Sequence, residues 1–443
     1  MKIISEKRLT ELEAGFDRLP CHALAMNSVF KNGIDSTCGV FDVQRRMRYG
    51  FSLELETGAA KNQKQSGRCW MFAALNTMAF EVMRRLKLED FEFSQAYIMF
   101  FDKLEKANHF LESIIETARL PLTDRLVSHL LTEPLGDGGQ WDMFRSLVEK
   151  YGVVPKEMMP ESFHSSNSAA LNKLMTAKLR EYAAELRSSL GSGILPDALG
   201  NIKDEMLDEI YKTLCIALGR PPRLINIELR DRDKNFIRIA NTAPKEFFEK
   251  YVGLELSDFA SLINAPTADK PFHKTYTVAY LASVRGGHDV RYLNLPAADL
   301  KKYALAQLKD GFPVWFGCDV GKFLDREYGS MDLRGFDYES AFGYTLGMTK
   351  AQRLDYHESL MTHAMVFTGV DLDLQGRPQR WRVENSWGEE RGKKGYYVMS
   401  DEWFSEYLYQ ILINKRYLPE QIIHELEQPP LVLEPWDPMG SLA

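Results

Sequence analysis

Gln63-Lys64-Gln65-Ser66-Gly67-Arg68-Cys69-Trp70 is the stretch that decides the fold, together with the apolar segment that follows it to about residue 87. In that segment apolar side chains recur at steps of three and four residues, at Phe72, Leu75, Ala79, Met83 and Leu86. Such a stripe is typical of a helix that packs one face against a core. Cys69 is therefore predicted to stand at the N-terminus of a core-facing helix.

The predicted position of Cys69 suits a nucleophile. A thiol attacks only as the thiolate, and the unpaired backbone N–H groups and positive dipole end of a helix N-terminus lower its pKa. Taken alone, however, a cysteine at the start of an apolar helix is more often a small, packed core residue. The presence or absence of partner residues has to decide between the two interpretations.

Two later residues fit the partners that a cysteine nucleophile requires. The imidazole must exchange a proton with the thiol, and a third group must orient the ring. His363 opens a predicted strand, and Asn385 ends another in Asn385-Ser386-Trp387-Gly388. Each has a simpler interpretation by itself, as a core histidine and a turn-forming asparagine. Their joint occurrence at strand ends that can be adjacent favours a catalytic set of Cys69, His363 and Asn385.

The composition is that of a globular chain and excludes several classes of protein. The 443 residues correspond to about three domain-sized units, or fewer if one is elaborated. Apolar residues make up 45% and charged residues 26%, and the formal net charge is −7. This charge provides no global basic field for nucleic acid or an anionic membrane. Neither class of partner is expected.

The chain also lacks the patterns of export and of membrane insertion. No run of about 20 apolar residues is present, and the N-terminus lacks the apolar centre of a signal peptide. Five cysteines form no CxxC pair and no regular spacing, at Cys21, Cys38, Cys69, Cys215 and Cys318. An odd number without such spacing argues against a disulfide framework or a zinc ribbon. A reducing, cytoplasmic location is therefore predicted.

No metal or nucleotide cofactor is expected from the motifs. The chain contains no HExxH, no P-loop and no GxGxxG. The segment 371–376 begins like a calcium loop, but Arg382 stands where a bidentate glutamate is needed, so a hairpin turn is predicted.

Helical patterns fill the middle of the chain and strand patterns the later part. Helices are predicted over about 171–190, 203–218 and 244–252, the last with Thr242 as its N-cap. Period-two segments after about residue 275 predict strands over 275–278, 313–317, 364–370, 380–384 and 396–399. From Gln428 onward four prolines and no helical period predict an extended tail.

These residues resemble the papain-like cysteine peptidases, and within them the bleomycin hydrolase and aminopeptidase C family. The broader resemblance rests on the Gln63 block and on the histidine and Asn-Ser-Trp-Gly segments in the same chain order. The narrower one rests on Ser66 to Trp70, Met361 to Met365, Trp315 to Gly321 and Trp436 to Ala443. The resemblance therefore covers the chain from about residue 60 to its last residue.

The resemblance implies an α+β fold with a papain-like core and a large helical insertion. His363 follows Cys69 by 294 residues, against about 130 to 150 in simpler papain-like enzymes. The expected division has five parts: an N-terminal arm and lead-in (1–60), a helical subdomain with Cys69 (61–160), a helical insertion (161–270), an antiparallel β-rich subdomain with His363 and Asn385 (271–427) and a tail in the active-site cleft (428–443).

The resemblance also implies a broad-specificity cysteine aminopeptidase that acts through a thioester. Cys69 would be the nucleophile, His363 the ion-pair partner and general acid, and Asn385 the group that orients the imidazole. Gln63 would donate to the oxyanion, and Trp387 would shield the contact between His363 and Asn385, unless it is an ordinary core tryptophan. The carboxylate of Ala443 would bind the free amino group of the substrate, unless the tail is disordered.

The expected assembly is a homohexamer, and the expected substrates are peptides with a free amino terminus. Three alternatives stay open: a papain-like endopeptidase, a catalytically silent scaffold, and a nucleic-acid-binding protein. The last is weakened by the acidic residues that interrupt the basic segment 220–234.

Overall fold

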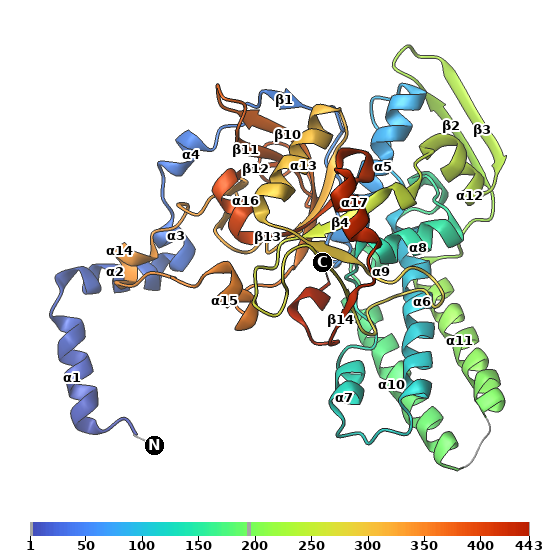
Figure 1. The fold of residues 1–443 in the computed structure, drawn as a ribbon, viewed down its shortest axis with the longest axis horizontal. Coiled ribbons are helices and arrows are strands. Elements are labelled where there is room, and N and C mark those ends of the chain that lie inside the picture. The colour runs from blue at the N-terminus through green and yellow to red at the C-terminus, as the bar shows by residue number, and fades with distance from the viewer. Residues whose placement is uncertain (1–2, 193–195, 443) are drawn as a thin grey trace.

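A large sheet and a set of helices form the two halves of the molecule (Figure 1). The computed structural model describes residues 3–192 and 196–442. Strands follow one another across the large sheet in the order β14-β5-β6-β4-β13-β7-β10-β11-β12-β9-β8, with β1 pairing with β10. The central strands β4, β13, β7, β10, β11 and β12 pair antiparallel. This mixture is the α+β architecture expected from the sequence.

The strands of the large sheet are β1 (Leu53–Glu54), β4 (Phe259–Ile263), β5 (Lys274–Val278), β6 (Tyr292–Asn294), β7 (Val314–Cys318), β8 (Leu324–Asp325), β9 (Ser330–Met331), β10 (His363–Leu372), β11 (Pro378–Glu384), β12 (Tyr396–Ser400), β13 (Leu408–Asn414) and β14 (Leu431–Leu433). The strands predicted after residue 275 thus correspond to β5, β7, β10, β11 and β12.

The helices are α1 (Glu6–Asp17), α2 (Pro20–Asn32), α3 (Ile34–Cys38), α4 (Val43–Arg46), α5 (Cys69–Leu86), α6 (Gln95–Glu116), α7 (Arg125–Thr132), α8 (Trp141–Tyr151), α9 (Phe163–Ser166), α10 (Ala169–Gly191), α11 (Pro196–Leu218), α12 (Pro244–Phe247), α13 (Ala297–Lys309), α14 (Tyr338–Phe342), α15 (Lys350–Asp355), α16 (Asp401–Tyr407) and α17 (Glu420–Glu427).

Helix α5 lies where the two halves meet. It starts at Cys69, as predicted, and buries most of its first three turns. It packs against β10 and β7, and the indole N–H of Trp315 on β7 donates to the carbonyl oxygen of Trp70 at 3.1 Å. One apolar cluster fills the space between the sheet and α5, α6, α8 and α10, and a second covers the other face under α13 and α16. The N-terminus of α5 is thereby fixed against the sheet.

The predicted helices of the middle segment are present. The face predicted for 171–190 is buried in α10 at Leu171, Met175, Leu179, Tyr182 and Leu186. α11 contains the helix predicted over 203–218, and α12 continues as a π-helical turn to Val252. Figure 1 shows α10 and α11 side by side with α6, as their packing requires.

Two details of the middle segment were predicted wrongly. Strands β2 (Ile225–Arg230), β3 (Phe236–Thr242) and β4 lie inside the segment that was expected to be helical. In β2 and β3 alternate apolar residues face one side, which is a strand period that the helical assignment overlooked. Thr242 ends β3, and the N-cap of α12 is Ala243, because the residue before Pro244 takes an extended conformation.

The tail is extended, with two short regular pieces. β14 pairs in parallel with β5 at one edge of the large sheet, and Pro438–Gly440 form a single 3-10 turn. At the other end of the chain, α1 and α2 extend away from the body of the molecule and bury no residue (Figure 1). Within the described residues, none of the helices combines the length and the apolar character that crossing a bilayer requires.

Candidate active site

The Cys69 thiol is buried at the start of α5, beside the strand that carries His363. Arg68 is the N-cap and provides no side-chain cap, so the first N–H groups of the helix stay available to the sulfur. Burial raises the pKa of the Cys69 thiol to about 11. The backbone N–H groups of Ala364, Trp70 and Cys69 itself act in the opposite direction. The participation of Ala364 places the sulfur next to the residue that follows His363.

His363 is held by Asn385 on the neighbouring strand. The imidazole Nε2 lies 2.9 Å from Oδ1 of Asn385, which follows the last residue of β11. Because Nε2 is engaged with Asn385, Nδ1 is the imidazole nitrogen that remains to exchange a proton with the Cys69 thiol. Burial lowers the pKa of His363 to about 4, the bond with Asn385 opposes that shift, and the positive charge of Arg326 adds to it.

Burial therefore disfavours a thiolate at Cys69 without an imidazolium at His363, and an imidazolium without a thiolate. Transfer of the proton from the thiol to the imidazole creates two opposite charges in a poorly solvated site, where they attract strongly. The two groups then titrate as a coupled pair rather than independently. Such a pair can supply a thiolate nucleophile and an imidazolium acid at the same time.

Trp387 lies against the imidazole, as expected. Its ring centroid is 4.9 Å from that of His363, at an interplanar angle of 39°. The indole is half-buried and also contacts Tyr397 on β12 edge-on. In this position the indole covers one side of the His363 ring.

Gln63 connects the loop before α5 to the Asn-Ser-Trp-Gly segment. Its backbone N–H donates to the carbonyl of Ser386 at 2.8 Å, and Ser386 Oγ donates to Gln63 Oε1 at 2.5 Å. Gln63 Nε2 donates one hydrogen to the carbonyl of Ser66 at 2.6 Å and keeps a second hydrogen. Ser386 is a supporting residue that was not singled out from the sequence, although it stands inside a motif that was.

Two further residues, to which the sequence analysis assigned no role, fix the loop before Cys69. Asp137 accepts from the backbone N–H of Gly67 at 2.9 Å and from Lys103 Nζ at 2.6 Å. Burial alone would raise the pKa of Asp137, but Lys103 and hydrogen bonds from Ser168 and Gly67 bring it well below its ordinary value. The carboxylate therefore stays charged and holds the loop. Its signal in the sequence is the glycine-rich setting Gly136-Asp137-Gly138-Gly139.

Arg68 forms the second support. Its side chain is fully buried, and its guanidinium donates to both carboxylate oxygens of Glu161, at 3.1 and 2.8 Å. Its Nε also donates to Ser66 Oγ at 2.8 Å. A bidentate pair of this kind fixes direction as well as distance. The residue before the nucleophile is thus tied to a segment 93 residues further along the chain.

The tail contacts the segment just before His363. Ser441 Oγ donates to the carbonyl of Met361 at 2.6 Å, and Gln140 Nε2 donates to the carbonyl of Ser441 at 2.7 Å. Met361 is two residues before His363. Earlier in the tail, Asp437 forms an ion pair with Lys270 at 2.8 Å, and the guanidinium carbon of Arg125 lies 3.8 Å from the centroid of the Trp436 ring. The tail is therefore anchored along its length up to Leu442, whereas Ala443 lies outside the described residues.

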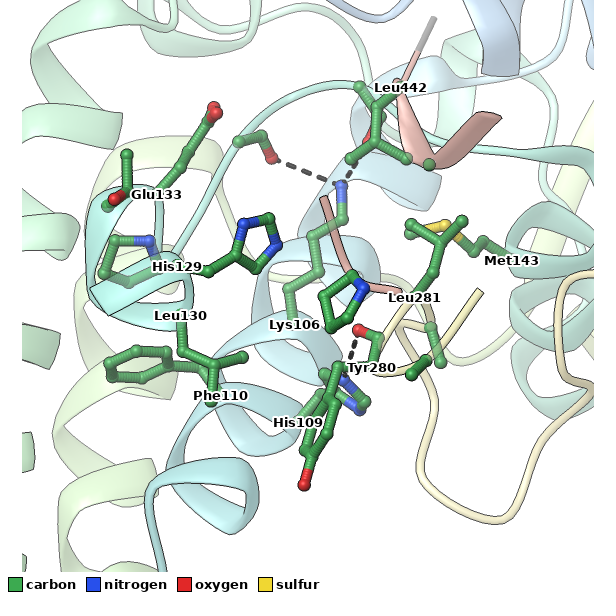
Figure 2. A pocket seen from close by; sticks show the side chains of 18 of the residues that line it. Lys106, His109, Phe110, His129, Leu130, Glu133, Met143, Tyr280, Leu281 and Leu442 are labelled. Carbon is green, nitrogen blue, oxygen red and sulfur yellow. Dashed lines mark hydrogen bonds between the residues drawn. The ribbon is translucent and has the colours of Figure 1, made fainter. Parts of the chain in front are cut away.

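A cavity of about 470 Å³ lies beside the tail (Figure 2). Lys106 and His109 come from α6, His129 from α7, and Leu442 from the tail (Figure 2). Lys106 Nζ donates to the carbonyl oxygens of Gly138 and Gly136, at 2.6 and 3.2 Å, and to Asp102 at 2.8 Å. Cys69, His363 and Asn385 do not line the cavity. Bond cleavage therefore belongs to the neighbouring site and not to this space.

The structure thus brings together Cys69, His363, Asn385, Gln63 and Trp387. Among the described residues, no group of three or more acidic, histidine or cysteine side chains is arranged to hold a metal ion. The arrangement can activate a thiol, protonate a leaving group and stabilise an oxyanion.

Comparisons with known proteins agree with this site. The model of the Peptidase C1-like family matches residues 3–440. Aminopeptidase C of Lactobacillus delbrueckii subsp. lactis is 45% identical over 445 residues, which cover 100% of this chain and 99% of the relative. Bleomycin hydrolase of Homo sapiens is 45% identical over 389 residues, 86% of either chain. A crystal structure of PepW from Lactobacillus rhamnosis HN001 has a TM-score of 0.98 at 48% identity and covers 100% of this chain and 99% of its own.

The α+β core, with a cysteine at a helix N-terminus facing a histidine on a sheet, is that of a papain-like cysteine peptidase. The chain belongs to the Peptidase C1-like family and, within it, to the bleomycin hydrolase and aminopeptidase C group. The resemblance found in the sequence motifs is confirmed.

Proposed function

We propose that this protein is a cysteine aminopeptidase of broad specificity, which releases residues from the amino end of peptides through a thioester on Cys69. Its relatives named Aminopeptidase C and Bleomycin hydrolase support the enzyme class. One structural observation carries the proposal further. Ser441 of the tail forms hydrogen bonds with Gln140 and Met361, which supports a tail that lies across the substrate cleft on one side of His363. A long peptide cannot pass through a cleft that is closed on that side.

In the proposed mechanism the Cys69 thiolate attacks the carbonyl carbon of the substrate. The imidazolium of His363 then gives its proton to the leaving amine, and Asn385 keeps the ring in position. The second hydrogen of Gln63 Nε2 and the backbone N–H of Cys69 stabilise the oxyanion. Water, activated by the neutral imidazole, hydrolyses the thioester and restores the enzyme.

The tail supplies the selectivity for a free amino terminus. A carboxylate at Ala443 would pair with the α-amino group of the substrate, which is a charge-assisted contact. Support for this role comes from the described part of the tail, since Ser441 donates to Met361, two residues before His363, and Leu442 lines the cavity beside the tail. The same tail disfavours the endopeptidase alternative, because it occupies the space that residues before the scissile bond would need.

A homohexamer in the cytoplasm is the proposed state of the protein. Helices α1 and α2 bury no residue and expose large apolar side chains, among them Leu24, Met26 and Phe30, and a second copy of the chain can cover them. The five cysteines remain free thiols, in keeping with a reducing compartment. A nucleic acid is not proposed as a partner, because basic residues of the β2–β3 hairpin are balanced by acidic ones, as in the pair of Arg238 with Glu228 at 2.9 Å.

The first experiment measures hydrolysis of one aminoacyl amide, free or acetylated at its α-amino group, with and without a thiol alkylator. We expect alkylator-sensitive cleavage of the free form alone. The Cys69→Ala variant, folded to the same melting temperature, is expected to show no turnover. Equal cleavage of both forms would remove the amine anchor, and no cleavage of either would favour the silent scaffold.

A tail variant tests the selectivity separately. Deletion of residues 442–443 is expected to shift products from single released residues toward internal fragments, because the cleft then admits a longer chain. Mass spectrometry of the products of a 10- to 15-residue peptide provides the measurement. An unchanged product pattern would contradict the proposed role of the tail.

A further inference from the structure

Arg326 stands beside the catalytic histidine without any role in the mechanism described above. It follows β8 and precedes β9, and its side chain is exposed. Its guanidinium carbon lies 5.5 Å from the centroid of the Trp387 ring, on which it stacks. Trp387 in turn lies 4.9 Å from the His363 ring. The positive charge of Arg326 is near enough to contribute to lowering the pKa of His363.

The guanidinium has no counterion within residues 3–192 and 196–442. No hydrogen bond or ion pair of its nitrogen atoms occurs there. The carboxylate of the preceding residue, Asp325, accepts instead from the backbone N–H groups of Glu327 and Tyr328, at 3.1 and 3.0 Å. By contrast, Arg334, after β9, pairs with Glu402 at 3.0 Å. Arg326 is therefore a positioned cation that keeps its donors available.

The order of strands places Arg326 on the side of the leaving group. β14, in the tail, lies at one edge of the large sheet, and β8, next to Arg326, lies at the other. β10, with His363 at its start, lies between them. In the proposed function, the amino end of the substrate points toward the tail. The part released after the scissile bond must then extend toward Trp387 and Arg326.

The distances limit which part of the leaving peptide Arg326 can reach. An extended chain advances roughly 3.3–3.6 Å per residue. Two contacts of 5.5 and 4.9 Å in series span at most the length of about three extended residues, so the guanidinium is within reach of the first residues after the scissile bond. Arginine favours carboxylates because its planar fork of N–H groups matches their two oxygen atoms.

We propose that Arg326 is a specificity-determining residue that binds a carboxylate on the leaving part of the substrate, close to the scissile bond. This inference rests on the proposed aminopeptidase function and names its preferred substrates. The carboxylate belongs either to an acidic side chain or to the free end of a dipeptide. The indole of Trp387 forms the floor of this subsite and the guanidinium its charged end.

The test compares kcat/KM for matched substrates that differ only in charge. Leu-Glu-amide against Leu-Gln-amide examines an acidic side chain, and Leu-Gly against Leu-Gly-amide examines the free end of a dipeptide. The protein is expected to prefer the anionic member of at least one pair by roughly threefold to fivefold at low salt, as for an exposed ion pair. The preference is expected to shrink in 0.5 M salt, where the Debye length is only about 4 Å.

Variants decide whether Arg326 causes the preference. Arg326→Gln is expected to remove it, and Arg326→Lys to retain part of it through the charge alone. Arg334→Gln makes the same change of net charge on the same part of the chain and is expected to keep the full preference. Equal rates for both members of both pairs, or an equal loss in Arg334→Gln, would overturn the assignment. No turnover of Leu-Gln-amide by the unaltered protein would instead overturn the proposed function, and the subsite with it.

Discussion

Arg326 and Asn385 act on the His363 imidazole in opposite directions. Beyond the effect of burial, the hydrogen bond to Asn385 raises its pKa, whereas the positive charge of Arg326 lowers it. The imidazolium is the general acid of the proposed mechanism, so its deprotonation defines the alkaline limb of the pH–rate profile. The two neighbours therefore set the upper end of the working pH range.

Arg326→Gln is predicted to move that alkaline limb to higher pH. Loss of a nearby positive charge favours the protonated ring, so its pKa rises and activity persists to higher pH. The measurement is kcat/KM of an uncharged aminoacyl amide between pH 5 and 10 at low salt. Arg334→Gln serves as control and should leave the limb in place. A limb that stays fixed or moves to lower pH in Arg326→Gln would contradict the prediction.

Gln63→Ala is predicted to lower kcat by about 10² to 10³, the usual cost of one oxyanion donor. KM should change much less, because the oxyanion exists only during the reaction. Gln65→Ala is the matched control from the same loop, since the Gln65 side chain is exposed and bonds Asn167 at 3.1 Å. Similar losses of kcat in both variants would point to a disturbed loop instead of a lost donor.

The element that joins the two halves of the site is the end of β11. Glu384, next to Asn385, is buried and accepts from Asn76 Nδ2 on α5 at 2.7 Å. Burial raises the pKa of this carboxyl group to about 7, against partial compensation by Thr57 and Lys61. Helix and strand are thus connected through a group that changes charge near neutral pH.

This connection makes the stability of the protein depend on pH. The folded protein holds the Glu384 proton up to a pKa of about 7, whereas the unfolded chain releases it near the ordinary value. Folded protein binds more protons in this interval, so the contribution of Glu384 to stability falls as pH rises from about 4.5 to 7. A glutamine at position 384 does not titrate, so its contribution to stability does not fall as pH rises.

The melting temperature of Glu384→Gln minus that of the unaltered protein is therefore predicted to increase by about 2–3 °C from pH 5 to pH 8. Differential scanning fluorimetry at both pH values measures the gain. Glu390→Gln is the control, because its side chain is exposed beyond the same motif. A difference that is constant with pH would show that the Glu384 carboxyl group does not titrate in this interval.

Local patterns predicted the elements that carry the catalytic residues, and long-range contacts account for what they missed. The apolar stripe after Cys69 and the strand after His363 depend on neighbouring residues, so α5 and β10 could be placed from the sequence. Arg68 pairs with Glu161, and Arg326 follows strand β8, which lies at one edge of the large sheet. Such contacts join residues that are far apart in the sequence, so the local periodicity of apolar residues cannot predict them.

At the scale of the whole molecule, the N-terminal helices have the least support from their own chain. α1 and α2 bury no residue, and Phe30 is 93% exposed. An isolated amphipathic helix without tertiary packing is only marginally stable in water. Contact with other copies of the chain would supply the missing burial.

The double variant Phe16→Glu with Phe30→Glu is predicted to reduce the assembly from about six times the chain mass of 50.8 kDa to smaller species. Charged groups in an apolar contact lose hydration without gaining partners. Light scattering after size-exclusion chromatography measures the mass, and Glu13→Gln, on the same helix as Phe16, is the control. A monomer for the unaltered protein would contradict the proposed hexamer.

The order of the catalytic parts along the chain has a consequence during synthesis. Cys69 leaves the ribosome 294 residues before His363, and Asn385 and the tail follow later still. At roughly 5–20 residues per second, the nucleophile waits about 15 to 60 seconds for its base. During that time no imidazole is present to take up the proton of the thiol. A nascent chain of this peptidase therefore cannot digest its neighbours on the polysome, and it becomes active only when strand β10 docks against α5.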